Sequence, residues 1–128
     1  MYISFAWTLP ALQALRKTCT RRNWSDDYAA RFHKDQLVDA YGKSPRNGGK
    51  KVGVIRLTCE PYKESTSRFP ASDYEVEGFK WMEEQGLFIQ GLTPMEFCQD
   101  WINANEDVWI IRFKPVILDT TCTKDNEK

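Results

Sequence analysis

The stretch Asp107-Val-Trp-Ile-Ile-Arg-Phe-Lys-Pro-Val-Ile-Leu118 decides the fold class, because β-branched and aromatic residues dominate it. It predicts a long strand that closes a sheet. Its most apolar part, Val108–Ile111, is far too short to cross a bilayer. We therefore expect a domain in which long strands come late in the chain.

The segments before this strand predict the rest of a sheet. Val52–Tyr62 predicts a second long strand, and the glycine-rich basic loop Gly42–Lys51 joins it to a short strand at Leu37–Tyr41 as a hairpin. Two further strands are predicted at Tyr2–Trp7 and Lys17–Arg22. About five strands are thus expected.

Helix start signals recur between these strands. The predicted helices begin at Thr8 (to about Leu15), at Ser25, at Ser72 (to Gly86) and at Thr93. The segment Lys63–Ser72 is predicted as a connecting loop. Together the pattern predicts an α+β fold, a small mixed or antiparallel β-barrel with flanking short helices. Residues 1–118 are expected to form one domain, and residues 119–128 a polar tail.

Composition narrows the function classes. The chain has 128 residues and is 41% hydrophobic and 13% aromatic, which argues against a disordered chain. Its 18 basic residues balance 18 acidic ones, so nucleic-acid binding would have to rest on local clustering. Four cysteines without a CxxC pair and one histidine predict no metal centre, and no cofactor is expected. No signal-peptide pattern is present, so we expect a reduced, cytoplasmic protein without a membrane partner.

The stretch Ala14-Leu-Arg-Lys-Thr-Cys-Thr-Arg-Arg22 concentrates four cations and two threonines in nine residues. On a strand, Thr20 and Arg22 share one face and Arg21 lies on the other. Lys17 and Thr20 converge only if Lys17 lies in the turn between the helix and the strand, which is where the predicted helix end places it. The stretch is a candidate site on this geometry.

Lys17 and Thr20 could form a reactive pair. Neighbouring cations disfavour the charged form of Lys17 and lower its pKa, which improves it as a base. A threonine hydroxyl becomes a useful nucleophile when such a base takes its proton. The alternative is a solvated basic edge strand without a catalytic role.

Glu77 is the second candidate. In a helix from Ser72, Tyr74 and Trp81 share its face, so the carboxylate would lose hydration and could shuttle protons. The alternative is a surface ion pair. Gly78 indicates a kink or a close backbone approach.

Aromatic and basic side chains supply candidate ligand contacts. Tryptophans can stack on an exposed base, although aromatic residues at such spacings more often belong to the core. The glycine-rich loop could hold phosphates through its cations and backbone N–H groups, although it lacks a P-loop pattern. The candidate contacts are Trp7, Arg21, Arg22, Trp24, Lys43, Arg46, Lys50 and Lys51.

The same stretch resembles the GxKxxTxR signature of ASCH (activating signal cointegrator homology) domains, a branch of the PUA-like superfamily. The segments "ISFAWTLPAL", "LVDAYGKSPR" and "DYEVEGF" also look like bacterial and phage ASCH proteins, from Ile3 to about Glu84. The resemblance implies a PUA-like barrel with a cleft at the signature.

ASCH proteins are associated with RNA binding, and one small bacterial branch is an amidohydrolase that deacetylates acetylated cytidine. Its lysine, threonine and glutamate fall by motif position on Lys17, Thr20 and Glu77. The signature glycine is Leu15 here, at a helix end that resembles a positive-φ cap, where leucine costs about 1–2 kcal/mol. A rebuilt turn at Leu15 would aim Lys17 elsewhere.

The expected function is a binding module whose basic cleft takes RNA, another nucleic acid or a modified nucleoside. The first alternative is the amidohydrolase, with Lys17 as base, Thr20 as nucleophile and Glu77 as proton shuttle. The second is a non-catalytic interaction domain. No feature of the chain indicates an oligomeric state.

Overall fold

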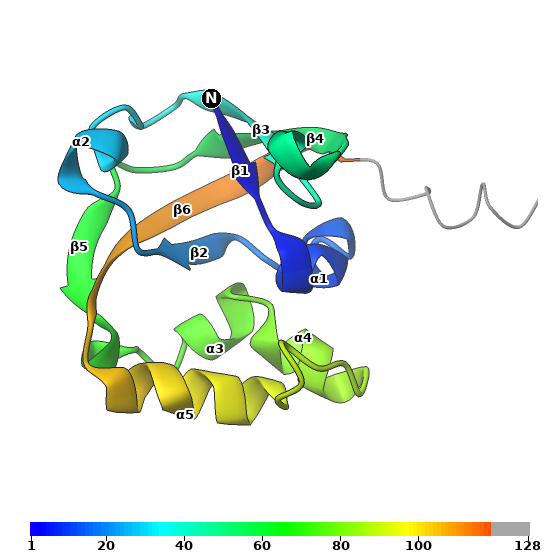
Figure 1. Cartoon of the computed structure of the whole chain (residues 1–128), viewed down its shortest axis with the longest axis vertical. Coiled ribbons are helices and arrows are strands. Elements are labelled where there is room, and N and C mark those ends of the chain that lie inside the picture. Colours follow the sequence, from blue (N-terminus) through cyan, green and yellow to red (C-terminus); the bar gives the residue numbers. More distant parts are fainter. Residues whose placement is uncertain (119–128) are drawn as a thin grey trace, which may run out of the picture.

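The computed structural model describes residues 1–118, whose six strands and eight short helical segments form two layers (Figure 1). The strands are β1 (Tyr2–Ser4), β2 (Cys19–Arg22), β3 (Leu37–Tyr41), β4 (Lys51–Leu57), β5 (Tyr62–Ser65) and β6 (Asp107–Leu118). The α-helices are α1 (Leu9–Gln13), α2 (Asp26–Ala29), α3 (Asp73–Val76), α4 (Phe79–Glu84) and α5 (Pro94–Ala104). Single 3₁₀ turns are η1 (Ala6–Thr8), η2 (Pro45–Asn47) and η3 (Thr66–Arg68).

The sheet is organised around β6. Its order is β1-β3-β4-β6-β2, with β5 also paired to β6. The first half of β6 pairs with β2 and β5, and its second half pairs with β4. Only the β1–β3 pair is parallel among these ladders. Within residues 1–118, β1 and β2 each have a single strand partner, so the curled sheet stays open between them.

Two apolar clusters stabilise the two layers. The barrel encloses Phe5, Leu12, Phe32, Ile55 and Phe113 among others. A second cluster, built on Phe79, Met82, Ile89 and Cys98, joins α1, α4 and α5 below the sheet. α5 is well capped: the Thr93 hydroxyl accepts from the Glu96 N–H and the Glu96 carboxylate accepts from the Thr93 N–H.

The predicted α+β, barrel-like fold class is confirmed. The strands at Leu37–Tyr41 and Asp107–Leu118 and the hairpin across the basic loop agree with the prediction. The prediction of a loop at Lys63–Ser72 is wrong, because the polar segment Tyr62–Ser65 pairs with β6 as an edge strand. The first strand also ends at Ser4, since the chain turns into η1. The predicted tail, residues 119–128, lies outside the described residues.

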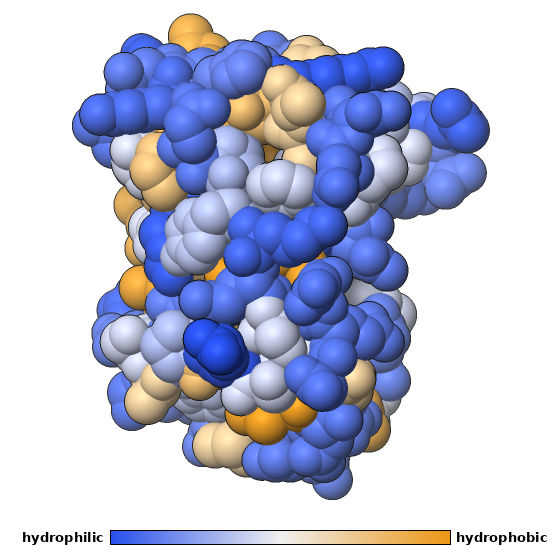
Figure 2. All heavy atoms as spheres, turned by 90° about the vertical axis from the view of Figure 1, so that its left-hand side faces the viewer, coloured by the Kyte–Doolittle hydropathy of each residue, from blue (hydrophilic) through white to orange (hydrophobic). Residues whose placement is uncertain are grey.

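The surface over α2 and β5 is mainly hydrophilic, with apolar atoms in scattered places (Figure 2). None of the helices in residues 1–118 has the length and apolar composition that a bilayer-spanning segment needs.

Candidate functional site

Lys17 is the buried centre of the candidate site. Its side chain is 1% exposed, and Nζ donates to the Glu77 backbone oxygen at 2.9 Å and to Glu77 Oε1 at 3.0 Å. It lies between α1 and β2, in the connection where the sequence placed it. Burial lowers the pKa of Lys17, and the Glu77 carboxylate offsets part of this shift. A buried lysine of this kind is a candidate base.

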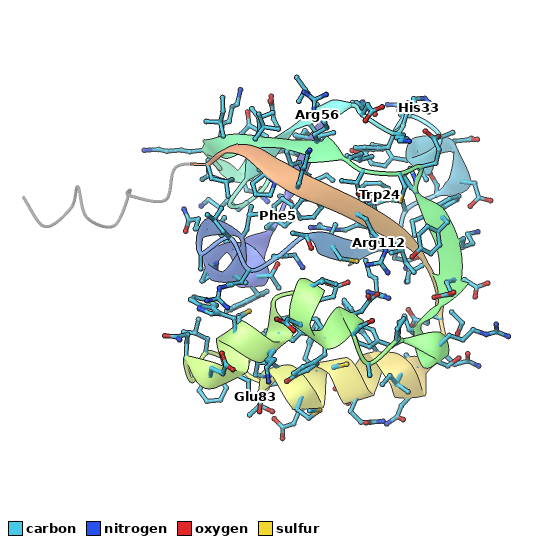
Figure 3. All side chains as sticks on the ribbon, turned by 180° about the vertical axis from the view of Figure 1, so that it is seen from behind. Phe5, Trp24, His33, Arg56, Glu83 and Arg112 are labelled. Carbon is cyan, nitrogen blue, oxygen red and sulfur yellow. The ribbon has the colours of Figure 1, made fainter. Side chains whose placement is uncertain are left out.

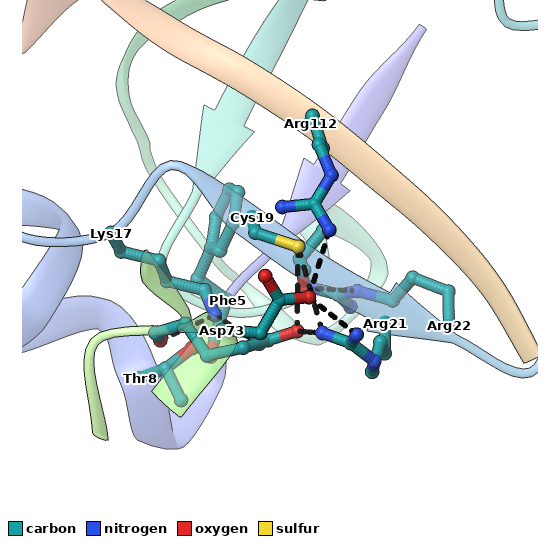
Figure 4. Close-up of polar contacts among 10 residues, drawn as sticks. Phe5, Thr8, Lys17, Cys19, Arg21, Arg22, Asp73 and Arg112 are labelled. Carbon is teal, nitrogen blue, oxygen red and sulfur yellow. Dashed lines mark hydrogen bonds and ion pairs between the residues drawn. The ribbon is translucent and has the colours of Figure 1, made fainter. Parts of the chain in front are cut away.

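A chain of ion pairs continues from Glu77 along β2. Arg21 donates from Nη1 to Glu77 Oε2 at 2.6 Å and from Nη2 to Asp73 Oδ2 at 2.5 Å. Arg112 of β6 donates from Nη2 to the same Asp73 oxygen at 2.8 Å (Figure 4). We call these five residues the ion-pair network: Lys17, Glu77, Arg21, Asp73 and Arg112.

The network holds its arginines charged. Burial disfavours the charge of Arg21, but the Glu77 carboxylate and hydrogen bonds to Asp73 and Glu77 outweigh it, so the pKa of Arg21 is raised. Burial also opposes the charge of Asp73, yet hydrogen bonds from Arg112 and Arg21 lower the pKa of Asp73. Arg21 was a predicted ligand contact; its terminal nitrogens bind two protein carboxylates and hold them beside the cavity described below.

Cys19 lies inside the same network. Its Sγ is 3.6 Å from Glu77 Oε2 and 3.7 Å from Arg21 Nη1. Burial, followed by the nearby Glu77 carboxylate, raises the pKa of Cys19 to about 12. The thiol is therefore neutral at physiological pH and is a poor nucleophile there.

The break at Gly78 brings Glu77 to β2. The prediction of one helix from Ser72 to Gly86 is wrong, because Gly78 has φ +91° and separates α3 from α4. A Cβ at Gly78 would lie 2.5 Å from the Ala11 Cβ, so the close approach of α1 requires glycine here. Glu77 then follows α3 directly, and its N–H donates to the Asp73 carbonyl. The Asp73 and Glu77 carboxylates, one helical turn apart, thus both face β2.

Leu15 adopts the left-handed conformation that the sequence resemblance led us to expect of a glycine at this position. It has φ +62°, and its side chain is 59% exposed. The N–H of Arg16 donates to the Ala11 carbonyl, which closes the end of α1. A positive-φ turn therefore forms here with leucine, and Lys17 points to Glu77.

Thr20 and Arg22 lie on the other face of β2, as strand alternation predicts. Arg22 Nε donates to Thr20 Oγ1 at 3.0 Å, and the Arg22 guanidinium lies 5.3 Å from the centre of the Phe5 ring. Burial lowers the pKa of Arg22 to about 10, so it stays charged at neutral pH. Among residues 1–118 the hydrogen bonds of Lys17 all go to Glu77, and none joins it to Thr20.

A cavity of about 260 Å³ brings the candidate catalytic residues together. We call it the site cavity. Lys17, Thr20 and Glu77 all line it, along with Arg21 and Arg22. Its opposite walls come from residues 4–8 at the end of β1 and from the helical layer, with apolar contacts from Trp7, Phe79, Phe97 and Trp101.

The other predicted contacts divide into two groups. Trp7 lines the site cavity with its side chain 55% exposed. Trp24 instead stacks on Phe32 with ring centres 4.4 Å apart, on the barrel side of the molecule (Figure 3). The four basic side chains of the β3–β4 loop and the start of β4 are exposed and do not line the site cavity: Lys43, Arg46, Lys50 and Lys51.

Sequence reasoning missed Asp73 and Arg112. Asp73 precedes Glu77 by four residues, which places two carboxylates one helical turn apart. Arg112 interrupts an apolar strand, and a cation in that position signals a buried partner. Both signals were present, but neither identifies the partner without the fold.

Within residues 1–118, no three His, Cys, Asp or Glu side chains gather as metal ligands. Cys19, Cys59 and Cys98 are free thiols.

The fold and the site together define a small α+β, barrel-like domain with a buried lysine–glutamate pair in a cavity wall. The sequence matches no known family, and it matches no curated protein. Among solved structures, it is similar to protein EF3133 from Enterococcus faecalis V583, described as a DUF984 protein. The TM-score is 0.56 at 14% identity, over 88% of this chain and 72% of the other. This similarity supports the fold alone, and the resemblance to ASCH domains stays a prediction.

Proposed function

We propose that this protein binds a single modified nucleobase or nucleoside in the site cavity. The observation that carries the proposal is the buried Lys17–Glu77 pair in the wall of that cavity, beside Thr20. Buried ionisable groups with a perturbed pKa, such as Lys17 with its lowered pKa, concentrate at functional sites. The resemblance of the signature to ASCH domains supports the same ligand class.

The size and lining of the site cavity suit such a ligand. About 260 Å³ is slightly below the range for drug-sized ligands, so one small molecule or one base fits better than a folded polymer. Trp7, whose side chain is 55% exposed, offers aromatic surface for a planar ring, while Thr20 and Arg22 offer polar contacts to its edge.

Calorimetric titration tests the binding proposal. We expect acetylcytidine to bind the wild-type protein, and the Lys17→Met variant to bind it at least about tenfold more weakly, because one buried charged contact is lost. Lys50→Met is the matched control, since Lys50 is exposed on the β3–β4 loop. Equal loss in both variants, or no binding by the wild type, contradicts the proposal.

A second candidate, an amidohydrolase, is favoured by the hydrogen bond from Arg22 to Thr20. Because Thr20 Oγ1 accepts from Arg22 Nε, its own proton remains available for transfer. The pKa of Lys17 is lowered by burial, which makes its neutral form more accessible as a base.

The reaction would proceed in two steps. Thr20 Oγ1 attacks the acyl carbon of the exocyclic amide as its proton passes to Lys17 Nζ. The carbon–nitrogen bond then breaks, the amine leaves with a proton relayed by Glu77, and water hydrolyses the acyl-threonine. Neutral Lys17 Nζ has two N–H donors, which match its two hydrogen bonds to Glu77 and leave its lone pair for the Thr20 proton.

Product analysis tests this chemistry. Wild-type protein incubated with acetylcytidine should release cytidine and acetate, whereas Thr20→Val, which is nearly isosteric, should release neither. Binding of acetylcytidine by Thr20→Val shows that the variant still forms the cavity. If the wild type turns over acetylcytidine no faster than Lys17→Ala, the amidohydrolase is excluded and only the binding function remains.

A further inference from the structure

A second cavity adjoins the site cavity at the open side of the barrel. It measures about 330 Å³ and is lined by Tyr2, Ile3, Ser4, Arg22, Trp24 and Tyr28. Ser4 and Arg22 also line the site cavity, so the two cavities share one rim. The rim lies between β1 and β2, where the curled sheet lacks a closing strand pair in residues 1–118.

Arg22 stands on this rim with unused donors. Nε donates to Thr20, and the guanidinium carbon lies over the Phe5 ring, 5.3 Å from its centre. Within residues 1–118 the terminal nitrogens of Arg22 have no carboxylate partner, whereas Arg21, its neighbour in sequence, binds two carboxylates. A guanidinium presents a planar fork that suits phosphate oxygens. Arg22 is thus a charged donor fixed between two cavities.

The second cavity has the aromatic lining of a base-stacking surface. Tyr2 is 38% exposed, and Trp24 and Tyr28 are half-buried and packed together with ring centres 5.0 Å apart. Exposed aromatic side chains bind successive bases of single strands by stacking. The site cavity, the Arg22 guanidinium and the second cavity therefore lie in sequence. This order matches a base, a phosphate and a second base of a nucleic-acid strand.

The geometry points to a phosphate-bridged dinucleotide unit of single-stranded nucleic acid as the ligand of the two cavities. The modified base occupies the site cavity, Arg22 binds the bridging phosphate, and the neighbouring base stacks in the second cavity. This inference rests on the proposed function and extends it from a free nucleoside to an oligonucleotide.

A ligand series tests the inference: acetylcytidine, its 5′-monophosphate, and a dinucleotide of acetylcytidine and adenosine. For the wild type we expect the affinity to rise along the series, with the dinucleotide at least about tenfold tighter than the nucleoside. In Arg22→Gln the ratio of monophosphate to nucleoside affinity should fall to about one, while the gain from the stacked second base remains. Affinity ratios are compared because Arg22 also borders the site cavity, so Arg22→Gln can weaken all three ligands alike.

Two further variants sharpen the test. Tyr2→Ala should weaken the dinucleotide more than the monophosphate, because it removes stacking surface and leaves Arg22 in place. Lys114→Gln removes the same charge from an exposed position of β6 outside both cavities and should leave every ratio unchanged.

The outcomes separate the inference from the proposed function. Equal affinity for all three ligands overturns the inference and leaves nucleoside binding in place. A monophosphate as tight as the dinucleotide shows that the phosphate comes from a free nucleotide and overturns the second base subsite. A monophosphate preference over the nucleoside that survives Arg22→Gln contradicts the phosphate contact, and absence of binding by all three ligands contradicts both proposals.

Discussion

Two stretches of the chain are equally rich in cations and differ completely in structure. Residues 14–22 carry four cations in nine residues, and the loop Gly42–Lys51 carries four in ten. In the first stretch Lys17 and Arg21 are buried and bind carboxylates from Asp73 and Glu77. The loop cations are exposed, and the ion pair of Lys51 with Asp39, at 3.2 Å, is exposed as well. Cation density alone therefore does not bury a cluster of cations; the buried cations are the ones paired with buried carboxylates.

The largest expected effect follows from breaking the ion-pair network at Glu77. Glu77→Gln leaves Lys17 and Arg21 buried without their shared charge and should lower the free energy of unfolding by about 3–5 kcal/mol. Urea unfolding measures it. The exposed Glu75, two residues earlier, is the matched control, and Glu75→Gln should change stability by less than about 0.5 kcal/mol. Equal effects would show that the network is not coupled to folding.

Asp73→Asn should have the next largest effect, about 2 kcal/mol at pH 7, because hydrogen bonds from two arginines weaken. The folded-state pKa of Asp73 is lowered, so its contribution is complete above the unfolded value of about 3.9 and is lost as pH falls through the folded value. The wild type should therefore lose more stability than Asp73→Asn between about pH 5 and pH 2.

Asp26 is the exposed counterpart for this acid titration. Its pKa is also lowered, through a hydrogen bond and ion pair with Lys63, but its side chain is 72% exposed. Asp26→Asn should leave the acid limb of the stability curve nearly unchanged. If Asp73→Asn loses as much stability as the wild type when the pH is lowered, the ion-pair network does not stabilise the fold.

A smaller and opposite effect is expected at Leu15. Because a leucine at φ +62° is strained and glycine is not, Leu15→Gly should stabilise the protein by up to about 1 kcal/mol, reduced by the entropy of the unfolded chain. Leu15→Ala keeps the strained conformation and serves as control. Thermal unfolding of both variants measures the change in stability. If Leu15→Gly is less stable than the wild type, the backbone at Leu15 is not strained.

The smallest effect is expected in the basic loop. Lys50→Gln should change stability by less than about 0.5 kcal/mol, because the side chain is exposed. If long RNA binds across the loop, the same variant should reduce the salt slope of RNA affinity by about one. A salt slope unchanged by Lys50→Gln would remove Lys50 from the phosphate contacts.

Local pattern was enough to predict most strands, and long-range contacts explain what it missed. β6 is mostly apolar and was predicted at its observed bounds. β5 is polar, since it is an edge strand with an exposed face, and the alternation that identifies strands is absent from it. Its pairing depends on where β6 lies.

The candidate site shows the same difference between what local sequence predicts and what long-range contacts decide. Lys17, Thr20 and Glu77 were singled out from spacing and resemblance, and the structure brings all three to one cavity. Glu77 reaches it through the positive φ at Gly78, so the expected bracketing by Tyr74 and Trp81 on one helix is not how it is buried. Tyr74 instead donates to Glu83. Helical periodicity alone cannot show the break at Gly78, because the segments on both sides of it, α3 and α4, favour helix.

The most direct measurement is a map of backbone amide shifts in ¹⁵N-labelled protein titrated with acetylcytidine. Ligand in the site cavity should shift the amides of residues 17–22 and 77–79 and leave those of residues 43–51 unchanged. Shifts confined to residues 43–51 would place the ligand on the exposed loop and contradict the central claim that the buried cations, with their carboxylates, form the site.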